Sequence, residues 1–154
     1  MKKFYYSLFI IIFLSILILG WGEIPQKSES AKDLRVEIIT DRNNYSLGQP
    51  VNLSIKATNK GKELISGYYP SSQKFDFVIQ DENKKEIWRW SYEKVFLMVI
   101  SPFQLESGES LIYRYTWEQI DNSGKPVPPG KYLVWGEIST VPGISSGVKE
   151  IKIQ

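Results

Sequence analysis

Apolar and polar side chains alternate along most of the chain, and this alternation constrains the fold more than any other feature. The period of two is clearest in residues 51–58, where Val51, Leu53, Ile55 and Ala57 are separated by polar residues. Such a period places all apolar side chains on one face of a strand. Polar turn signals interrupt the alternation repeatedly, and no segment past residue 33 carries a helical period. The sequence therefore predicts an all-β domain.

Eight segments are predicted to be strands, and they fill a single domain over residues 34–154. They are residues 34–39, 51–58, 75–79, 87–90, 95–100, 111–117, 132–138 and 148–153. About eight short strands in a domain of this size are typical of an immunoglobulin-like antiparallel β-sandwich, with a barrel as the alternative. We expect four large aromatic side chains to fill the space between the sheets: Trp88, Trp90, Phe96 and Trp117. Gly48 is expected to supply a positive φ in the turn before residue 51.

The first 22 residues have a different character. Lys2 and Lys3 precede the uncharged run Phe4–Trp21, and a positive start followed by an apolar run directs export or membrane insertion. The run is close to the ~20 residues that span a membrane, so residues 1–22 are either a membrane anchor or a signal peptide cleaved before Glu23. Residues 23–33 are polar and are predicted to be a linker. We expect the domain to be exported and extracytoplasmic, either secreted or anchored to the membrane.

Two missing residue types restrict the chemistry, because the chain contains neither His nor Cys. Without them, Ser–His–Asp and Cys–His catalysis and thiolate metal sites cannot be built. Carboxylate-pair and Ser–Lys chemistry remain open, but no such pair stands out. Asp121-Asn122-Ser123-Gly124 departs from the calcium-loop spacing and is predicted to be a turn. We therefore predict no enzymatic activity, no catalytic residues, no cofactor and no metal.

The charge of the predicted domain argues against nucleic acid as a partner. The chain has 19 basic and 17 acidic residues, and Lys2 and Lys3 account for the difference. From Glu23 onward the two signs balance, so the domain has no broad positive field for phosphate backbones.

Several motifs in order resemble the intracellular proteinase inhibitor (BsuPI) domain family between about Leu34 and Ile138. The motifs are Tyr45-x-x-Gly48-x-x-Val51, Asn59, Ser72-x-x-Phe75-Asp76-Phe77, Trp88-Arg89-Trp90, Phe96, Leu105-x-x-Gly108-Glu109, Tyr115-x-Trp117 and Pro126-Val127-Pro128-Pro129-Gly130-x-Tyr132. The resemblance implies a β-sandwich and inhibition of a subtilisin-like serine proteinase. The family is regarded as intracellular, so an exported member would need a proteinase outside the cytoplasm as its partner.

Two segments are candidates for contact with a partner. The first is Leu64–Ser72, a predicted loop in which Tyr68, Tyr69 and Pro70 combine aromatic side chains with a rigid backbone. The second is Pro126–Pro129. Both segments also fit plain connections between strands. Two functions therefore remain open: inhibition of a serine proteinase, and a non-inhibitory structural or binding role for a cell-envelope protein.

Overall fold

The computed structural model describes residues 32–154, which include nearly all of the predicted domain. Residues 1–31, with the predicted signal or anchor and most of the linker, lie outside the described residues. No helix within residues 32–154 has the length and apolar character needed to cross a bilayer.

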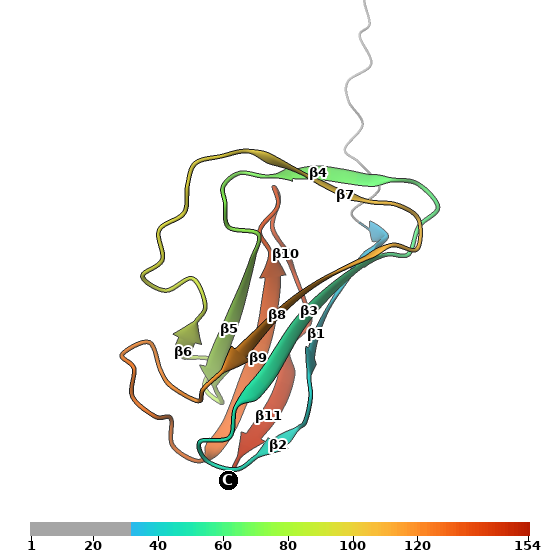
Figure 1. Ribbon diagram of the computed structural model, residues 1–154. Coiled ribbons are helices and arrows are strands. Elements are labelled where there is room, and N and C mark those ends of the chain that lie inside the picture. Colours follow the sequence, from blue (N-terminus) through green and yellow to red (C-terminus); the bar gives the residue numbers. More distant parts are fainter. Residues whose placement is uncertain (1–31) are drawn as a thin grey trace, which may run out of the picture.

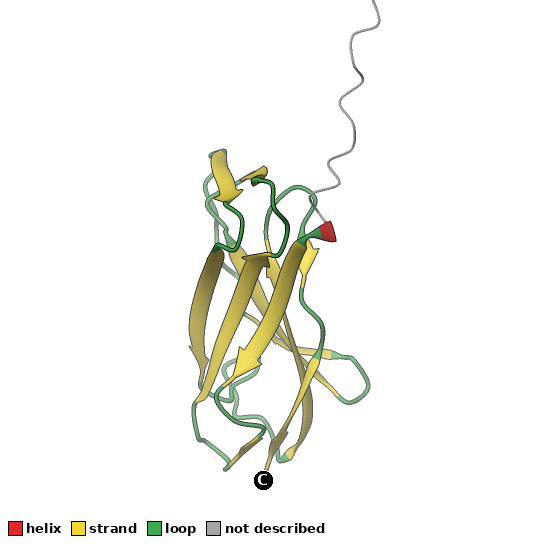
Figure 2. Cartoon of the chain, turned by 90° about the vertical axis from the view of Figure 1, so that its right-hand side faces the viewer, coloured by secondary structure: helices red, strands yellow, loops and turns green. Residues whose placement is uncertain are grey.

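The described chain is built from strands that form three sheets (Figures 1 and 2). The strands are β1 (Leu34–Thr40), β2 (Asn44–Tyr45), β3 (Val51–Asn59), β4 (Ile65–Tyr69), β5 (Phe75–Asp81), β6 (Glu86–Arg89), β7 (Ser101–Leu105), β8 (Ser110–Trp117), β9 (Gly130–Ile138), β10 (Ile144–Ser145) and β11 (Lys149–Ile153). One sheet has the order β1-β3-β8, and the larger has the order β2-β11-β9-β5-β6 with β10 beside β9. The predicted all-β, antiparallel sandwich is confirmed, with the short β2–β11 pair as a parallel exception.

The third sheet is the pair β4–β7, which lies across the end of the sandwich opposite the C-terminus (Figure 1). Its register pairs Ile65 with Leu105 at one end and Tyr69 with Ser101 at the other. Ile65, Tyr69, Phe103 and Leu105 belong to the same buried cluster as the residues of the two large sheets. The pair therefore closes the end of the core.

The core between the two large sheets follows the alternation of the sequence. The predicted apolar face of β3 is buried, with Ile55 fully inaccessible. Trp88 and Trp117 lie in the core as predicted, whereas Trp90 and Phe96 are partly buried near its margin. Opposite Ile55 lies Gly136 of β9, where a Cβ would overlap the Ile55 side chain. Glycine at this position therefore allows the two sheets to approach closely.

The turn between β2 and β3 confirms the role predicted for Gly48, whose φ is +75°. The buried side chain of Gln119 crosses to this turn from the connection after β8. Its Oε1 accepts a hydrogen bond from the Gly48 backbone N–H at 2.7 Å, and its Nε2 donates to Ser46 O at 3.0 Å and Gln49 O at 2.7 Å. The turn is thus fixed by a side chain about 70 residues away in sequence.

Seven of the eight predicted strands are present, and the eighth, residues 95–100, was wrong. Residues 94–100 form neither helix nor strand. Four strands were not predicted: β2 and β10, which have two residues each, and β4 and β7. The segment 64–72, predicted as a loop, contains β4. Gly67 in β4 and Pro102 in β7 are poor strand formers and hide this pair in the sequence.

Candidate functional site

The connection from β6 to β7 carries the longest run of exposed apolar residues in the described domain. We call its residues Val95–Ile100 the apolar loop. Five of its six side chains are exposed: Val95 by 95%, Leu97 by 73%, Met98 by 91%, Val99 by 49% and Ile100 by 73%. Single exposed apolar residues are ordinary, but a contiguous run of this kind marks a binding surface. In Figure 1 this connection rises along the sandwich to the β4–β7 end.

Ser72, in the connection between β4 and β5, holds the middle of the apolar loop. The Leu97 backbone N–H donates to Ser72 Oγ at 2.9 Å, and the Ser72 backbone N–H donates to Leu97 O at 2.9 Å. The Val99 N–H also donates to Leu97 O at 2.9 Å. The backbone of this exposed segment is therefore fixed at its centre.

Aromatic packing fixes the start of the apolar loop. The ring of Phe96, the one side chain of the loop that points inward, lies 5.9 Å from that of Trp90, which in turn lies 4.3 Å from Phe75. Lys94 Nζ lies 3.7 Å from the centre of the Trp90 ring, which is within the distance of a cation–π interaction. Partial burial lowers the pKa of Lys94, against the charge of Asp76, which raises it. The start of the loop therefore packs on an aromatic cluster, formed by Phe75, Trp90 and Phe96, at the edge of the core.

Asp76 of β5 binds the residues on both sides of Trp90, namely Arg89 and Ser91. Its Oδ1 accepts hydrogen bonds from the backbone N–H groups of Phe77 at 3.0 Å and Ser91 at 3.1 Å. Its Oδ2 accepts from Ser91 Oγ at 2.6 Å and from Arg89 Nη1 at 2.8 Å. Burial alone lowers the pKa of Arg89, but its hydrogen bonds with Glu86 and Asp76 outweigh burial and raise it. A buried carboxylate therefore ties the end of β6 to the body of the domain.

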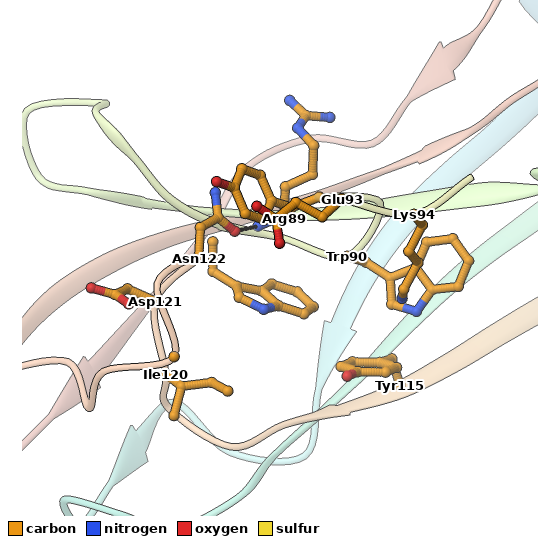
Figure 3. A pocket seen from close by; sticks show the side chains of 11 residues that line it. Arg89, Trp90, Glu93, Lys94, Tyr115, Ile120, Asp121 and Asn122 are labelled. Atoms are coloured by element: carbon orange, nitrogen blue, oxygen red, sulfur yellow. Dashed lines mark hydrogen bonds between the residues drawn. The ribbon is translucent and has the colours of Figure 1, made fainter. Parts of the chain in front are cut away.

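An open hollow of about 260 Å³ lies beside the start of the loop (Figure 3). Trp88 and Tyr115 stack at 5.4 Å along it, and the Arg89 backbone N–H donates to Asn122 Oδ1 at 2.9 Å. Within residues 32–154, no three acidic side chains gather as a metal site would require. The hollow offers aromatic and polar surface for contact.

The structure separates the three residues predicted to contact a partner. Tyr68 is 43% exposed and Pro70 is exposed, whereas Tyr69 is 4% exposed. The Tyr69 hydroxyl lies 3.0 Å from that of Tyr113, and its ring meets Phe103 edge-on. Burial, and then the Tyr113 hydrogen bond, raises the pKa of Tyr69. A role in binding stays a prediction for these residues, with Tyr68 and Pro70 as those that offer surface.

The second candidate, Pro126–Pro129, is tied down. Val127 is buried and its N–H donates to Gln119 O at 2.9 Å, while the Tyr132 hydroxyl donates to Pro128 O at 2.7 Å. The neighbouring residues 121–124 form the predicted turn, in which Asp121 Oδ1 accepts from the Ser123 and Lys125 N–H groups. Both segments are ordered connections between β8 and β9.

Sequence comparison bears on the apolar loop directly, because the matched region includes it. Residues 38–142, more than two thirds of the chain, match the family described as intracellular proteinase inhibitor (BsuPI). The chain belongs to the BsuPI family. The match covers the last three residues of β1 and everything from β2 to β9. No curated protein matches the chain.

Solved structures are similar to this chain only at low identity and with TM-scores below 0.5. Spo0M, the sporulation control protein of Bacillus subtilis, is 16% identical with a TM-score of 0.48 over 79% of this chain and 49% of its own. The DNA glycosylase AlkC of Pseudomonas fluorescens is 14% identical with a TM-score of 0.48, over 79% of this chain and 30% of its own. The CARDB domain of PF1109 from Pyrococcus furiosus is 13% identical with a TM-score of 0.44, over 79% of this chain and 88% of its own. The chain thus spans less than half of the first two proteins, and these similarities do not extend to function.

Proposed function

We propose that this BsuPI domain inhibits a subtilisin-like serine proteinase outside the cytoplasm, acting by binding and without catalysis of its own. The apolar loop carries the proposal, because it exposes five large apolar side chains on a braced backbone. Membership of a proteinase inhibitor family supplies the class of partner.

Two properties of the loop suit binding in a proteinase cleft: its exposed apolar side chains and its ordered backbone. Burying an apolar side chain on binding contributes about 1.5–3 kcal/mol, so several such side chains can supply a large part of the affinity. The contacts of Leu97 with Ser72, and of Phe96 with Trp90, order the loop before binding. Order before binding reduces the conformational entropy lost in the complex.

The compartment is part of the proposal. The charged start at Lys2 and Lys3 and the uncharged run Phe4–Trp21 support export. Cell fractionation and the intact mass of the mature protein test this. A chain beginning at Glu23 would mean release, a full-length chain in the membrane fraction would mean anchorage, and a full-length chain in the cytosol would contradict export.

Titration with subtilisin tests the inhibitory activity. We expect the purified full chain, in mild detergent, to abolish subtilisin activity at a stoichiometric ratio. A variant with Val95→Ser, Leu97→Ser and Met98→Ser should weaken inhibition by about 100-fold or more, since losing these three central apolar contacts together should cost about 2.8 kcal/mol or more. Undiminished proteinase activity at micromolar excess of the wild-type chain would favour the non-inhibitory role at the cell envelope.

A further inference from the structure

We infer that the apolar loop enters the proteinase as a substrate-like strand, with the Met98 side chain in the main specificity pocket and Ser72 as the brace behind it. This inference rests on the proposed function and names the residues that set its specificity. Three observations lead to it: the direction of the loop's backbone groups, the exposure of Met98, and the fixation of the loop on both sides.

The backbone groups of the loop are divided between the domain and solvent. The N–H and C=O of Leu97 are both bonded to Ser72. Within residues 32–154, Phe96 and Met98 have no backbone hydrogen bond. Their N–H and C=O groups are therefore free to pair with a cleft that binds peptides by strand addition.

Met98 is the side chain best placed to enter a pocket. The hydrogen bond from the Val99 N–H to Leu97 O closes a three-residue turn with Met98 at its tip. Met98 is 91% exposed, and its unbranched thioether chain adapts to narrow apolar pockets. Val95 is similarly exposed, lies three residues earlier in the apolar loop and offers a second apolar contact. The partner is therefore a proteinase whose main pocket accepts large apolar side chains.

The loop is held on both sides of Met98, which explains how it could occupy a cleft without being consumed. Before it, Phe96 packs on Trp90 and Ser91 is bonded to Asp76. After it, Ser101 pairs with Tyr69 in the β4–β7 sheet. Hydrolysis of the Met98–Val99 bond requires the new amine to move away, and this fixation opposes that movement. Ser72 is the positioning residue of the group.

A change of specificity tests the role of Met98. The trypsin pocket carries an aspartate that accepts Arg or Lys, so Met98→Arg in the full chain should create inhibition of trypsin. The same variant should inhibit subtilisin about 100-fold less well than the wild type, the size of a lost central contact. The matched control is Leu47→Arg. Leu47 is exposed at the other end of the domain, where its backbone N–H donates to Gln154 O. This variant should inhibit subtilisin as the wild type does and should not inhibit trypsin.

The outcomes separate this inference from the proposed function. If the wild type inhibits subtilisin and Met98→Arg inhibits it equally well, the assignment of Met98 is wrong while inhibition stands. If neither chain inhibits either enzyme, both proposals fail. Trypsin inhibition by Leu47→Arg as strong as by Met98→Arg would also overturn the assignment, because charge alone would then explain the gain.

Replacement of Ser72 tests the brace. With Ser72→Ala we expect subtilisin to cut the Met98–Val99 bond during incubation, seen by mass spectrometry as the addition of one water, with an unchanged melting temperature. Ser72→Thr keeps the hydroxyl and should restore resistance. A Ser72→Ala chain that stays intact as long as the wild type would show that Ser72 has no positioning role.

Discussion

Replacement of Asp76 by alanine is expected to lower the free energy of unfolding by about 3–4 kcal/mol. Asp76 is 4% exposed, and its carboxylate accepts four hydrogen bonds, two from backbone N–H groups and two from the side chains of Ser91 and Arg89. Alanine would leave these donors without an acceptor in a low-dielectric site. The Arg89 side chain is 32% exposed and would recover water, so the estimate stays below the full cost of an isolated buried charge. Urea denaturation followed by tryptophan fluorescence measures the change.

Glu86→Ala provides the matched control, because Glu86 bonds the same guanidinium at 2.8 Å but lies at the surface. Exposed ion pairs contribute about 0–1 kcal/mol, so this variant should unfold close to the wild type. Equal destabilisation by Asp76→Ala and Glu86→Ala would contradict the role of burial. Asp76→Ala should also loosen the start of the apolar loop, because Ser91 loses both of its bonds to β5.

Alternation predicted the large sheets well because the long strands β3 and β9 each have one buried face. In β3 and β9 every second side chain is inaccessible, so the period of two in the sequence reflects burial directly. The φ of Gly48 was also predictable, since a turn of this type favours glycine. The contact of Gln119 with this turn was not predictable. Gln119 lies about 70 residues away, and nothing local to either segment indicates the contact.

The error at residues 95–100 has a physical cause. Six consecutive apolar residues fit a strand buried on both faces, and periodicity cannot distinguish such a strand from an exposed apolar segment. Only the fold shows that Phe96 alone packs on the core while Met98 is exposed. The candidate site was therefore hidden inside a prediction of core structure.

Tyr68 and Tyr69, predicted with Pro70 to contact a partner, lie at the end of β4 rather than in a loop, and the role of all three in binding stays a prediction. In β4 successive side chains point to opposite faces, so Tyr69 is buried and Tyr68 exposed. The sequence suggested two adjacent tyrosines on one loop and could not show this division. Ser72, at the end of the same segment, is the residue that contacts the apolar loop. Its role depends on a contact 25 residues away and has no local signal.

Asn59→Ala is expected to cost about 3–5 kcal/mol of unfolding free energy, because Asn59 joins the β4–β7 sheet to the sandwich. The residue is inaccessible, and its Nδ2 donates to Glu63 O at 2.7 Å and Leu105 O at 2.9 Å. Its Oδ1 accepts from the Gly61 N–H at 2.9 Å. Alanine would remove the side-chain partner of these three backbone groups, one of which lies just before β4 and one in β7.

Hydrogen exchange distinguishes this local role from a general loss of stability. Amide protons of β4 and β7 should lose more protection in Asn59→Ala than those of β3 and β9, because the sheet that closes the core would open first. The control is Asn52→Ala on the same strand, whose exposed side chain bonds only to Asp41 and Thr116 and should cost under about 1 kcal/mol. Uniform loss of protection in all strands would contradict a separate β4–β7 unit. Selective loss would show that the attachment of the β4–β7 sheet to the sandwich depends on the buried Asn59 side chain.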